Sequence, residues 1–260
     1  MLKHFSQLIV SALALFLTAC GGSGATDQEE KTGLIAGIPE ASGICYSSTR
    51  NSLFVVSDKG IIVEIDTNGK FVRDKSFNSL DKHDFEGVAC NDNGDLNIAV
   101  EGADNILIVN QSTLNLKNDL NIKRGNILTK DKEFGLEGIA IFEGKVYLSN
   151  QSFNAYPDTD PSIIFTIDSL NNPEPEIMEL FDHGYRDISG LAFYKNYLYM
   201  VSDSDNLLIK YDVTNNQTVF TKQLTKFSVE GITFDEKKHI YFADDDNGKI
   251  YKYDISQFGI

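Results

Sequence analysis

The sequence predicts an all-β fold, a five-bladed β-propeller, from two observations. One motif recurs five times, in which an acidic or hydroxyl residue precedes a glycine and a short apolar strand follows. The copies are ASGICY (41–46), FEGVAC (85–90), LEGIAI (136–141), ISGLAF (188–193) and VEGITF (229–234). Successive motif glycines are 44, 51, 52 and 41 residues apart, close to the roughly 40–50 residues of a four-stranded blade.

We expect residues 1–19 to be a signal peptide that takes no part in the fold. The apolar run 8–17 is too short and too poorly flanked to span a membrane as a helix. It ends in LTAC (17–20), which resembles a bacterial lipobox, so we expect Cys20 to be lipidated and to become the new N-terminus. The alternatives are an ordinary cleaved signal peptide and a buried helix with a chance cysteine.

Residues 20–32 are expected to form the lipidated cysteine and a flexible polar tether, because the stretch after Cys20 is rich in glycine and charged residues. Several acyl chains on one cysteine would anchor the protein durably to a membrane. We therefore expect it in the cell envelope. Because Gly21 rather than Asp follows the cysteine, the sorting pattern of such lipoproteins favours the outer membrane if the host is Gram-negative.

Residues 33–260 are expected to form the propeller domain, with each motif opening the first strand of a blade. Expected second strands are SLFVVSD (52–58), DLNIAVE (95–101), KVYLSNQ (145–151), YLYMVSD (197–203) and HIYFADD (239–245). Expected third strands are IIVEID (61–66), NILIVN (105–110), IIFTID (163–168), LLIKYD (207–212) and KIYKYD (249–254). The Asp or Asn that closes each third strand is expected to cap a turn.

The fifth repeat stops after its third strand, whereas a spare strand-like segment, TGLIAGI (32–38), precedes the first repeat. This segment can supply the missing fourth strand. Pairing the two ends of the domain in this way would close the ring and remove exposed sheet edges.

The recurring [E/S]-G-[ILV]-[AC] openings, the S-D and D-D endings of the second strands and the lipobox resemble the SdiA-regulated family of bacterial β-propellers. The resemblance covers essentially all of residues 33–256. It implies a five-bladed propeller with a calcium site near the channel and a distant kinship to phytase-like and lactonase-like propellers. It implies no established activity.

The charge balance excludes some partners. The chain has 23 Lys and Arg and 38 Asp and Glu; without Lys3 of the signal peptide, 22 basic against 38 acidic residues give a net charge of −16. Nucleic acids and anionic lipid headgroups call for basic patches, so we expect no nucleic-acid partner. An acidic balance favours cations, although a solvated acidic surface would give the same number.

Carboxylates are expected to converge at one mouth of the propeller channel. In an up-and-down blade, the first strand lines the channel, and its start lies on the same face of the disc as the end of the second strand. The residues before the motif glycines are Ser42, Glu86, Glu137, Ser189 and Glu230. Two positions earlier come Glu40, Asp84, Gly135, Asp187 and Ser228, and the second strands end at Asp58, Glu101, Gln151, Asp203 and Asp245.

So many carboxylates around one axis repel each other unless some are protonated or a cation compensates them. Ca²⁺ fits best, because it accepts six to eight oxygen ligands in flexible geometry. The candidate ligands are Glu86, Glu137, Glu230, Asp58, Asp187 and Asp203. In the structural alternative, the glutamate before each glycine closes a blade by accepting backbone N–H bonds from its neighbour.

A long loop, 150–162, is expected between the second and third strands of the third repeat, and another, 123–135, before its first strand. Loops on a rigid scaffold often shape a ligand pocket. Asn150, Phe153 and Tyr156 are the candidates here for an unknown small-molecule or protein ligand, with the aromatic rings stacking on it. Ordinary variation in loop length is the alternative.

Cys45 and Cys90 occupy adjacent positions in the repeat, and successive strand residues face opposite sides of a sheet. We therefore expect them to be packing residues rather than partners, although an oxidising compartment would permit a disulfide.

Two functions fit these features. The first is a calcium-stabilised binding or scaffold lipoprotein. The second is a calcium-dependent hydrolase, lactonase-like or phytase-like, in which the ion polarises a carbonyl or phosphoester oxygen and activates water. No histidine or other clear general base stands beside the candidate ligands, and few basic residues are available to hold a polyanion.

Overall fold

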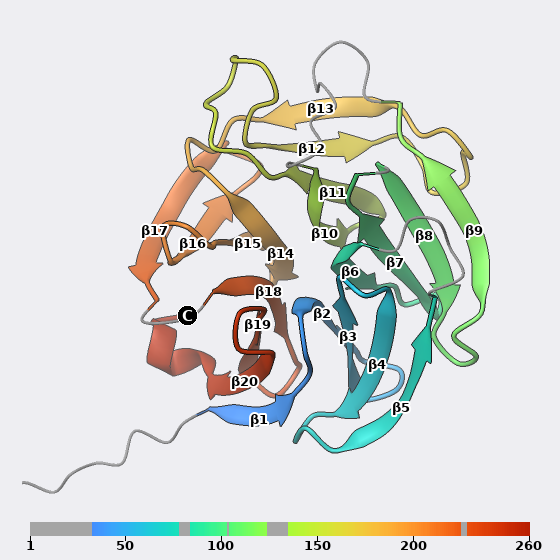
Figure 1. Ribbon diagram of the computed structural model, residues 1–260. Coiled ribbons are helices and arrows are strands. Elements are labelled where there is room, and N and C mark those ends of the chain that lie inside the picture. The colour runs from blue at the N-terminus through green and yellow to red at the C-terminus, as the bar shows by residue number, and fades with distance from the viewer. Residues whose placement is uncertain (1–32, 78–83, 103, 124–134, 225–227) are drawn as a thin grey trace, which may run out of the picture. The chain divides into compact units, whose positions relative to one another are not determined.

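The computed structural model describes residues 33–77, 84–102, 104–123, 135–224 and 228–260. The expected signal peptide, Cys20 and the tether lie outside these residues. Five four-stranded antiparallel sheets surround a common axis (Figure 1), which confirms the predicted five-bladed propeller. Within the described part of the chain, no helix is long and apolar enough to cross a membrane.

Each blade runs outward from an inner first strand to an outer fourth strand. Blade one contains β2 (Ala41–Ser47), β3 (Ser52–Ser57), β4 (Ile61–Asp66) and β5 (Phe71–Ser76). Blade two contains β6 (Phe85–Cys90), β7 (Asp95–Val100), β8 (Asn105–Asn110) and β9 (Leu116–Asn121). Blade three contains β10 (Leu136–Phe142), β11 (Lys145–Asn150), β12 (Ile163–Ile167) and β13 (Ile177–Phe181). Blade four contains β14 (Ile188–Tyr194), β15 (Tyr197–Ser202), β16 (Leu207–Asp212) and β17 (Gln217–Gln223).

The fifth blade joins the two ends of the domain, as predicted. It contains β18 (Val229–Phe234), β19 (His239–Asp244) and β20 (Lys249–Asp254), and β1 (Leu34–Gly37) is its outer strand. Beyond the paired strands, the amide of Ile38 donates to the carbonyl of Gly248 at 2.8 Å. A short 3₁₀ turn, Ile255–Phe258, follows β20.

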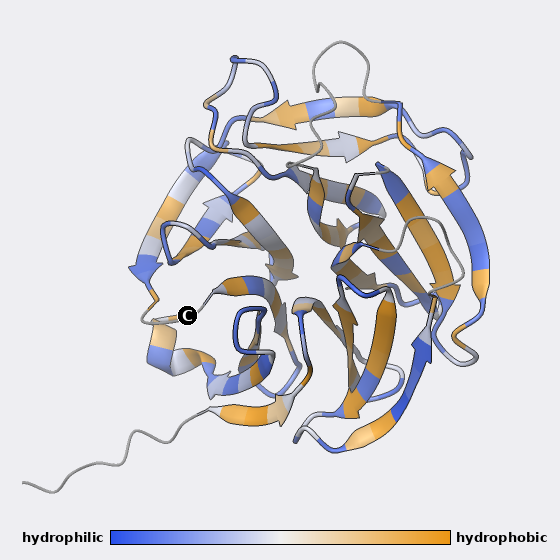
Figure 2. Ribbon diagram, in the orientation of Figure 1, coloured by the Kyte–Doolittle hydropathy of each residue, from blue (hydrophilic) through white to orange (hydrophobic). Residues whose placement is uncertain are grey.

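The apolar core lies between neighbouring blades. Between blades one and two, for example, Phe54 and Val56 pack with Phe85 and Ile98, all of them buried. The inner and second strands are almost wholly buried, whereas the outer strands are mostly exposed. Figure 2 shows hydrophobic and hydrophilic residues following each other in short bands along the strands.

The motif glycine allows five inner strands to meet around a narrow axis. In each first strand, the register with the second strand shifts across the residue before this glycine, and in β6 and β10 across the glycine as well. Such a bulge re-aims a side chain. A Cβ on Gly43 would collide with the carbonyl oxygen of Glu86 in the next blade and lie 2.9 Å from the amide nitrogen of Val88. The glycines of the other blades contact the next inner strand in the same way. The glycine is therefore required for packing of the inner strands. The bulge beside it directs the preceding Glu or Ser toward the channel mouth.

The turn caps expected after the third strands are present in every blade. The Asp66 carboxylate, for example, accepts the amides of Asn68 and Lys70 at 2.8 and 3.0 Å. The equivalent acceptors are Asn110, Asp168, Asp212 and Asp254. These side chains stabilise turns and take no part in the channel mouth.

The interpretation of the two cysteines was wrong, because Cys45 of β2 and Cys90 of β6 form a disulfide with a Cα–Cα distance of 5.5 Å. The prediction treated opposite-facing side chains as unable to meet. Adjacent blades, however, pack opposite faces of their sheets together, so positions one residue apart in the repeat are the ones that face each other.

Candidate metal centre

The carboxylates predicted to converge lie at the end of the axis where the first strands begin. We call this end the acidic mouth; its acids are Asp58, Asp84, Glu86, Glu101, Glu137, Asp187, Asp203, Glu230 and Asp245. Backbone hydrogen bonds tie the end of the second strand to the segment that precedes the first strand. They run from Glu101 to Asp84 (3.0 Å), Gln151 to Gly135 (3.0 Å), Asp203 to Asp187 (3.2 Å) and Asp245 to Ser228 (3.2 Å).

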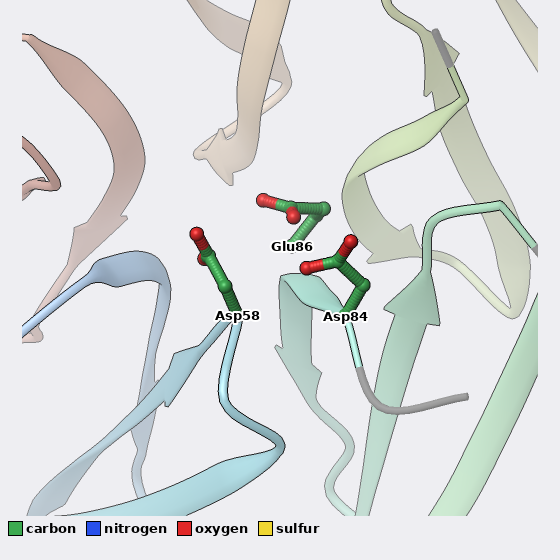
Figure 3. A group of neighbouring side chains, drawn as sticks. All are labelled: Asp58, Asp84 and Glu86. Carbon is green, nitrogen blue, oxygen red and sulfur yellow. The ribbon is translucent and has the colours of Figure 1, made fainter. Parts of the chain in front are cut away.

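The tightest group consists of Asp58, Asp84 and Glu86. One carboxylate oxygen from each lies within 4.8 Å of the other two. Figure 3 shows the three carboxylates directed into one space, Asp58 from the end of β3 and the other two from the start of β6. The hydroxyl of Ser42 donates a hydrogen bond to Asp58 and orients its carboxylate. The group therefore spans blades one and two.

Glu86 and Glu137 are deeply buried acids, at 9% and 4% exposure, and Glu230 is half-buried. Among the described residues, none donates a hydrogen bond to these three carboxylates or forms an ion pair with them. In the structural alternative, these carboxylates would accept backbone N–H groups of a neighbouring blade. The described part of the chain contains no such hydrogen bond. Burial without partners is costly for a charged carboxylate, and a bound cation would remove that cost.

The pKa values of Glu86, Glu137 and Glu230 are all raised, because burial disfavours the charged carboxylate. Burial, followed by the charge of Asp245, raises the pKa of Glu230 to about 9. Burial, followed by the charge of Asp58, raises the pKa of Glu86 well above its ordinary range. Burial, followed by the charge of Glu86, does the same to the pKa of Glu137. The charges that act on each of them come from several blades, so the mouth behaves as one electrostatic unit.

Blades four and five carry a second group of acids at the mouth. Burial and the charge of Asp187 raise the pKa of Asp203 to about 6, and burial and the charge of Asp58 raise that of Asp245 to about 6. Asp187 is only 3% exposed, and one of its carboxylate oxygens accepts the amide of Ser204 at 2.8 Å.

Blade three lacks an acid at the earlier position, which is Gly135, and Glu101 of blade two fills this space. A Cβ on Gly135 would lie 2.5 Å from Cγ of Glu101 and 3.4 Å from Oε1. The missing side chain of one blade is thus replaced by a longer side chain from its neighbour.

The loop 150–162 lies beside the mouth, because the carbonyl of Ser152 accepts the amide of Asp187 at 2.9 Å. Asn150 is fully buried and donates to Oδ1 of Asp160 and to the carbonyl of Pro161, so it braces the loop. Phe153 and Tyr156 are 50% and 41% exposed. Of the three predicted pocket residues, the two aromatic ones are therefore partly exposed at the surface, and Asn150 is not.

The six candidate ligands include Asp58 and Glu86 of the tight group but omit Asp84. Asp84 lies two residues before Glu86, a repeat position already expected to face the mouth. This position alone could have identified Asp84 as a candidate ligand. Glu101 and Asp245 were also left out of the candidate ligands, although each directly follows a second strand at the mouth. Glu101 raises the pKa of Glu137, and Asp245 raises that of Glu230, through charge interactions. The sequence does not show which residues of different blades lie close enough to interact.

Carboxylate oxygens alone suit a hard cation, and Ca²⁺ accepts such a flexible set. Among the described residues, two basic side chains near the mouth form ion pairs: Lys59 with Glu40, and Arg186 with Asp205 at 2.9 Å. Within the described residues, the tight group has oxygen donors only. The arrangement can bind a divalent cation and leave part of its coordination to water or a ligand, because Asp58 and Asp84 are partly exposed.

Comparisons with solved structures support the fold. Glutaminyl cyclase from Myxococcus xanthus has a TM-score of 0.66 at 10% identity, over 84% of this chain and 91% of that one. Streptogramin B lyase has a TM-score of 0.50 at 14% identity, over 84% and 70%. At such identities the likeness shows the fold alone. No curated protein sequence gave a significant match. The profile of the SdiA-regulated family matches residues 27–251, and the chain belongs to this family.

Proposed function

We propose that this protein is a lipid-anchored β-propeller of the cell envelope that binds Ca²⁺ at the acidic mouth and acts as a binding or scaffold module. The supporting observation is the group of Asp58, Asp84 and Glu86, whose carboxylate oxygens lie within 4.8 Å of each other. Glu137 and Glu230 add unpartnered carboxylates from two further blades. A cation at this point would offset the mutual repulsion of acids that come from separate sheets.

Calorimetric titration of the full chain in detergent with CaCl₂ tests this proposal. The wild type should bind Ca²⁺, and Glu86→Gln should weaken binding at least about tenfold, because one charged ligand of a hard cation is lost. Glu179→Gln is the matched control: Glu179 is exposed, pairs with Lys145 at 3.2 Å and lies in outer strand β13. Equal affinity in all three proteins would reject the proposed ligands.

The lipid anchor is supported by the LTAC sequence at 17–20 and by the polar stretch that follows it. Metabolic labelling with a palmitate analogue, followed by membrane fractionation, tests it. Label and membrane association should both be lost in Cys20→Ser. A labelled Cys20→Ser protein, or an unlabelled wild type, would refute the anchor and leave the calcium proposal untouched.

A calcium-dependent hydrolase is the second candidate. The observation that favours it is the partial exposure of Asp58 and Asp84, which would leave a bound ion open to a substrate on one side. Exposed Phe153 and Tyr156 lie on the loop beside this mouth. A screen of lactones and phosphoesters with CaCl₂ or EDTA separates the two functions, since only a hydrolase turns over a substrate in a calcium-dependent way.

A further inference from the structure

The disulfide and the tight carboxylate group join the same two blades. Cys45 and Cys90 link β2 of blade one to β6 of blade two. Asp58 belongs to blade one, and Asp84 and Glu86 belong to blade two. One covalent bond therefore fixes, near the far end of the inner strands, the pair of blades whose acids meet at the mouth.

A short path connects the disulfide to the carboxylates. Ser42 lies three residues before Cys45 in β2 and donates the hydrogen bond that orients Asp58. Glu86 lies four residues before Cys90 in β6. At about 3.3 Å per residue, these are distances of roughly 10–13 Å along rigid strands. Between the two points, Gly43 packs directly on the carbonyl of Glu86, so a shift of one inner strand is transmitted to the other.

We propose that the Cys45–Cys90 disulfide is a positioning element for the cation site. It holds β2 and β6 at a fixed separation and thereby presets the spacing of the Asp58 and Glu86 carboxylates. The inference rests on the proposed calcium binding. Without an ion, the carboxylates of Asp58 and Asp84 repel each other across the boundary between the two blades. A cross-link that resists their separation reduces the free-energy cost of assembling the site when the ion binds. Cleavage of the disulfide should therefore weaken Ca²⁺ binding.

The disulfide is reachable from the end of the channel opposite the acidic mouth. Both cysteines line a cavity of about 140 Å³ there, together with Ala89, Ala140 and other inner-strand residues. Cys90 is half-buried. A dithiol such as dithiothreitol can reduce it: the S–S bond breaks, two cysteine thiols form, and the dithiol is oxidised to its cyclic disulfide.

The test compares Ca²⁺ affinity, by calorimetry on the full chain in detergent, among four samples. These are the oxidised wild type, the wild type reduced with dithiothreitol, the Cys45→Ala/Cys90→Ala variant, and Arg73→Ala. Reduction and the double substitution should each weaken binding about fivefold or more, a typical coupling between sites. Dithiothreitol should have no further effect on the double variant.

Arg73→Ala is the matched control. Arg73 donates hydrogen bonds to the carbonyls of Gln111 and Ser112, so it also ties blade one to blade two, but from outer strand β5. Its loss should lower stability and leave Ca²⁺ affinity unchanged. If the double cysteine variant binds Ca²⁺ as tightly as the oxidised wild type, or if Arg73→Ala weakens binding equally, the positioning role is rejected while calcium binding stands.

A second readout needs no ion. Hydrogen exchange in EDTA should be faster in residues 41–47 and 84–90 of the double cysteine variant than in the wild type, and unchanged there in Arg73→Ala. If the wild type fails to bind Ca²⁺, the proposed function fails, and this readout alone decides whether the disulfide positions the mouth. Equal exchange in the wild type and the double variant would overturn the inference on its own.

Discussion

Cγ of Glu101 lies 2.5 Å from the position that a Cβ on Gly135 would occupy. A glutamate of blade two thus lies against the backbone of blade three, where that blade has no side chain of its own. The pair shows that the acidic mouth is assembled across blade boundaries rather than by five independent copies of one motif.

Gly135→Ala is predicted to destabilise the ion-free protein by about 1–3 kcal/mol, the usual cost of overpacking. The added methyl group must displace Glu101, because the conflict involves Cγ rather than the mobile end of the side chain. Urea unfolding in EDTA measures this effect. Adding Glu101→Ala to the same protein should restore most of the loss, and a strictly additive double variant would contradict the contact.

The ion-free protein is predicted to lose stability as the pH rises from 5 to 9. The pKa of Glu230 is raised to about 9, and those of Asp203 and Asp245 to about 6. A raised carboxyl pKa means that the folded state holds more protons than the unfolded state in this range, so deprotonation favours unfolding. Urea midpoints in EDTA at pH 5, 7 and 9 should fall in that order. Saturating CaCl₂ should flatten the decline, because the ion takes the place of the protons.

Glu137→Gln is predicted to have opposite effects on stability and on binding. Glu137 is 4% exposed, and burial raises its pKa. An amide removes the cost of a buried charge, so the ion-free variant should be more stable than the wild type at pH 8. Ca²⁺ affinity should fall in the same variant. Thermal unfolding with EDTA and with CaCl₂ measures both, and lower stability in both conditions would show that Glu137 is a structural group.

The disulfide is predicted to contribute about 4 kcal/mol to stability in the chain-entropy account, because it closes a loop of 45 residues. Urea unfolding of Cys45→Ala/Cys90→Ala beside the oxidised wild type checks this figure. The same comparison under reducing conditions serves as a control, since the difference should then largely vanish. A difference that persists after reduction would assign the loss to packing of the cysteine side chains.

The fold could be predicted from the sequence because one constraint is repeated five times. Gly43 and its counterparts must be glycine for the inner strands to approach, and the residue before each of them must then turn toward the mouth. Asp58 and Glu86 follow from this register alone. The closing strand β1 was predictable because the last repeat lacked a fourth strand.

Contacts between neighbouring blades could not be predicted from the sequence, because they depend on which faces of adjacent sheets pack together. Cys45 and Cys90 meet because opposite faces of adjacent sheets pack together, a relationship that a single-strand pattern does not contain. The contact of Glu101 with Gly135 likewise crosses a blade boundary. The pocket role of Asn150 stays a prediction; the structure adds that its amide donates to Asp160 and to the carbonyl of Pro161 within the loop.

The most direct test of the calcium site is an X-ray structure from crystals grown in CaCl₂, with anomalous differences measured at long wavelength. The predicted result is an anomalous peak at normal calcium–oxygen distances, about 2.3–2.6 Å, from Asp58, Asp84 and Glu86. The account would be contradicted if crystals grown in millimolar CaCl₂ gave no anomalous peak at the mouth and these carboxylates were hydrogen-bonded to water or to each other.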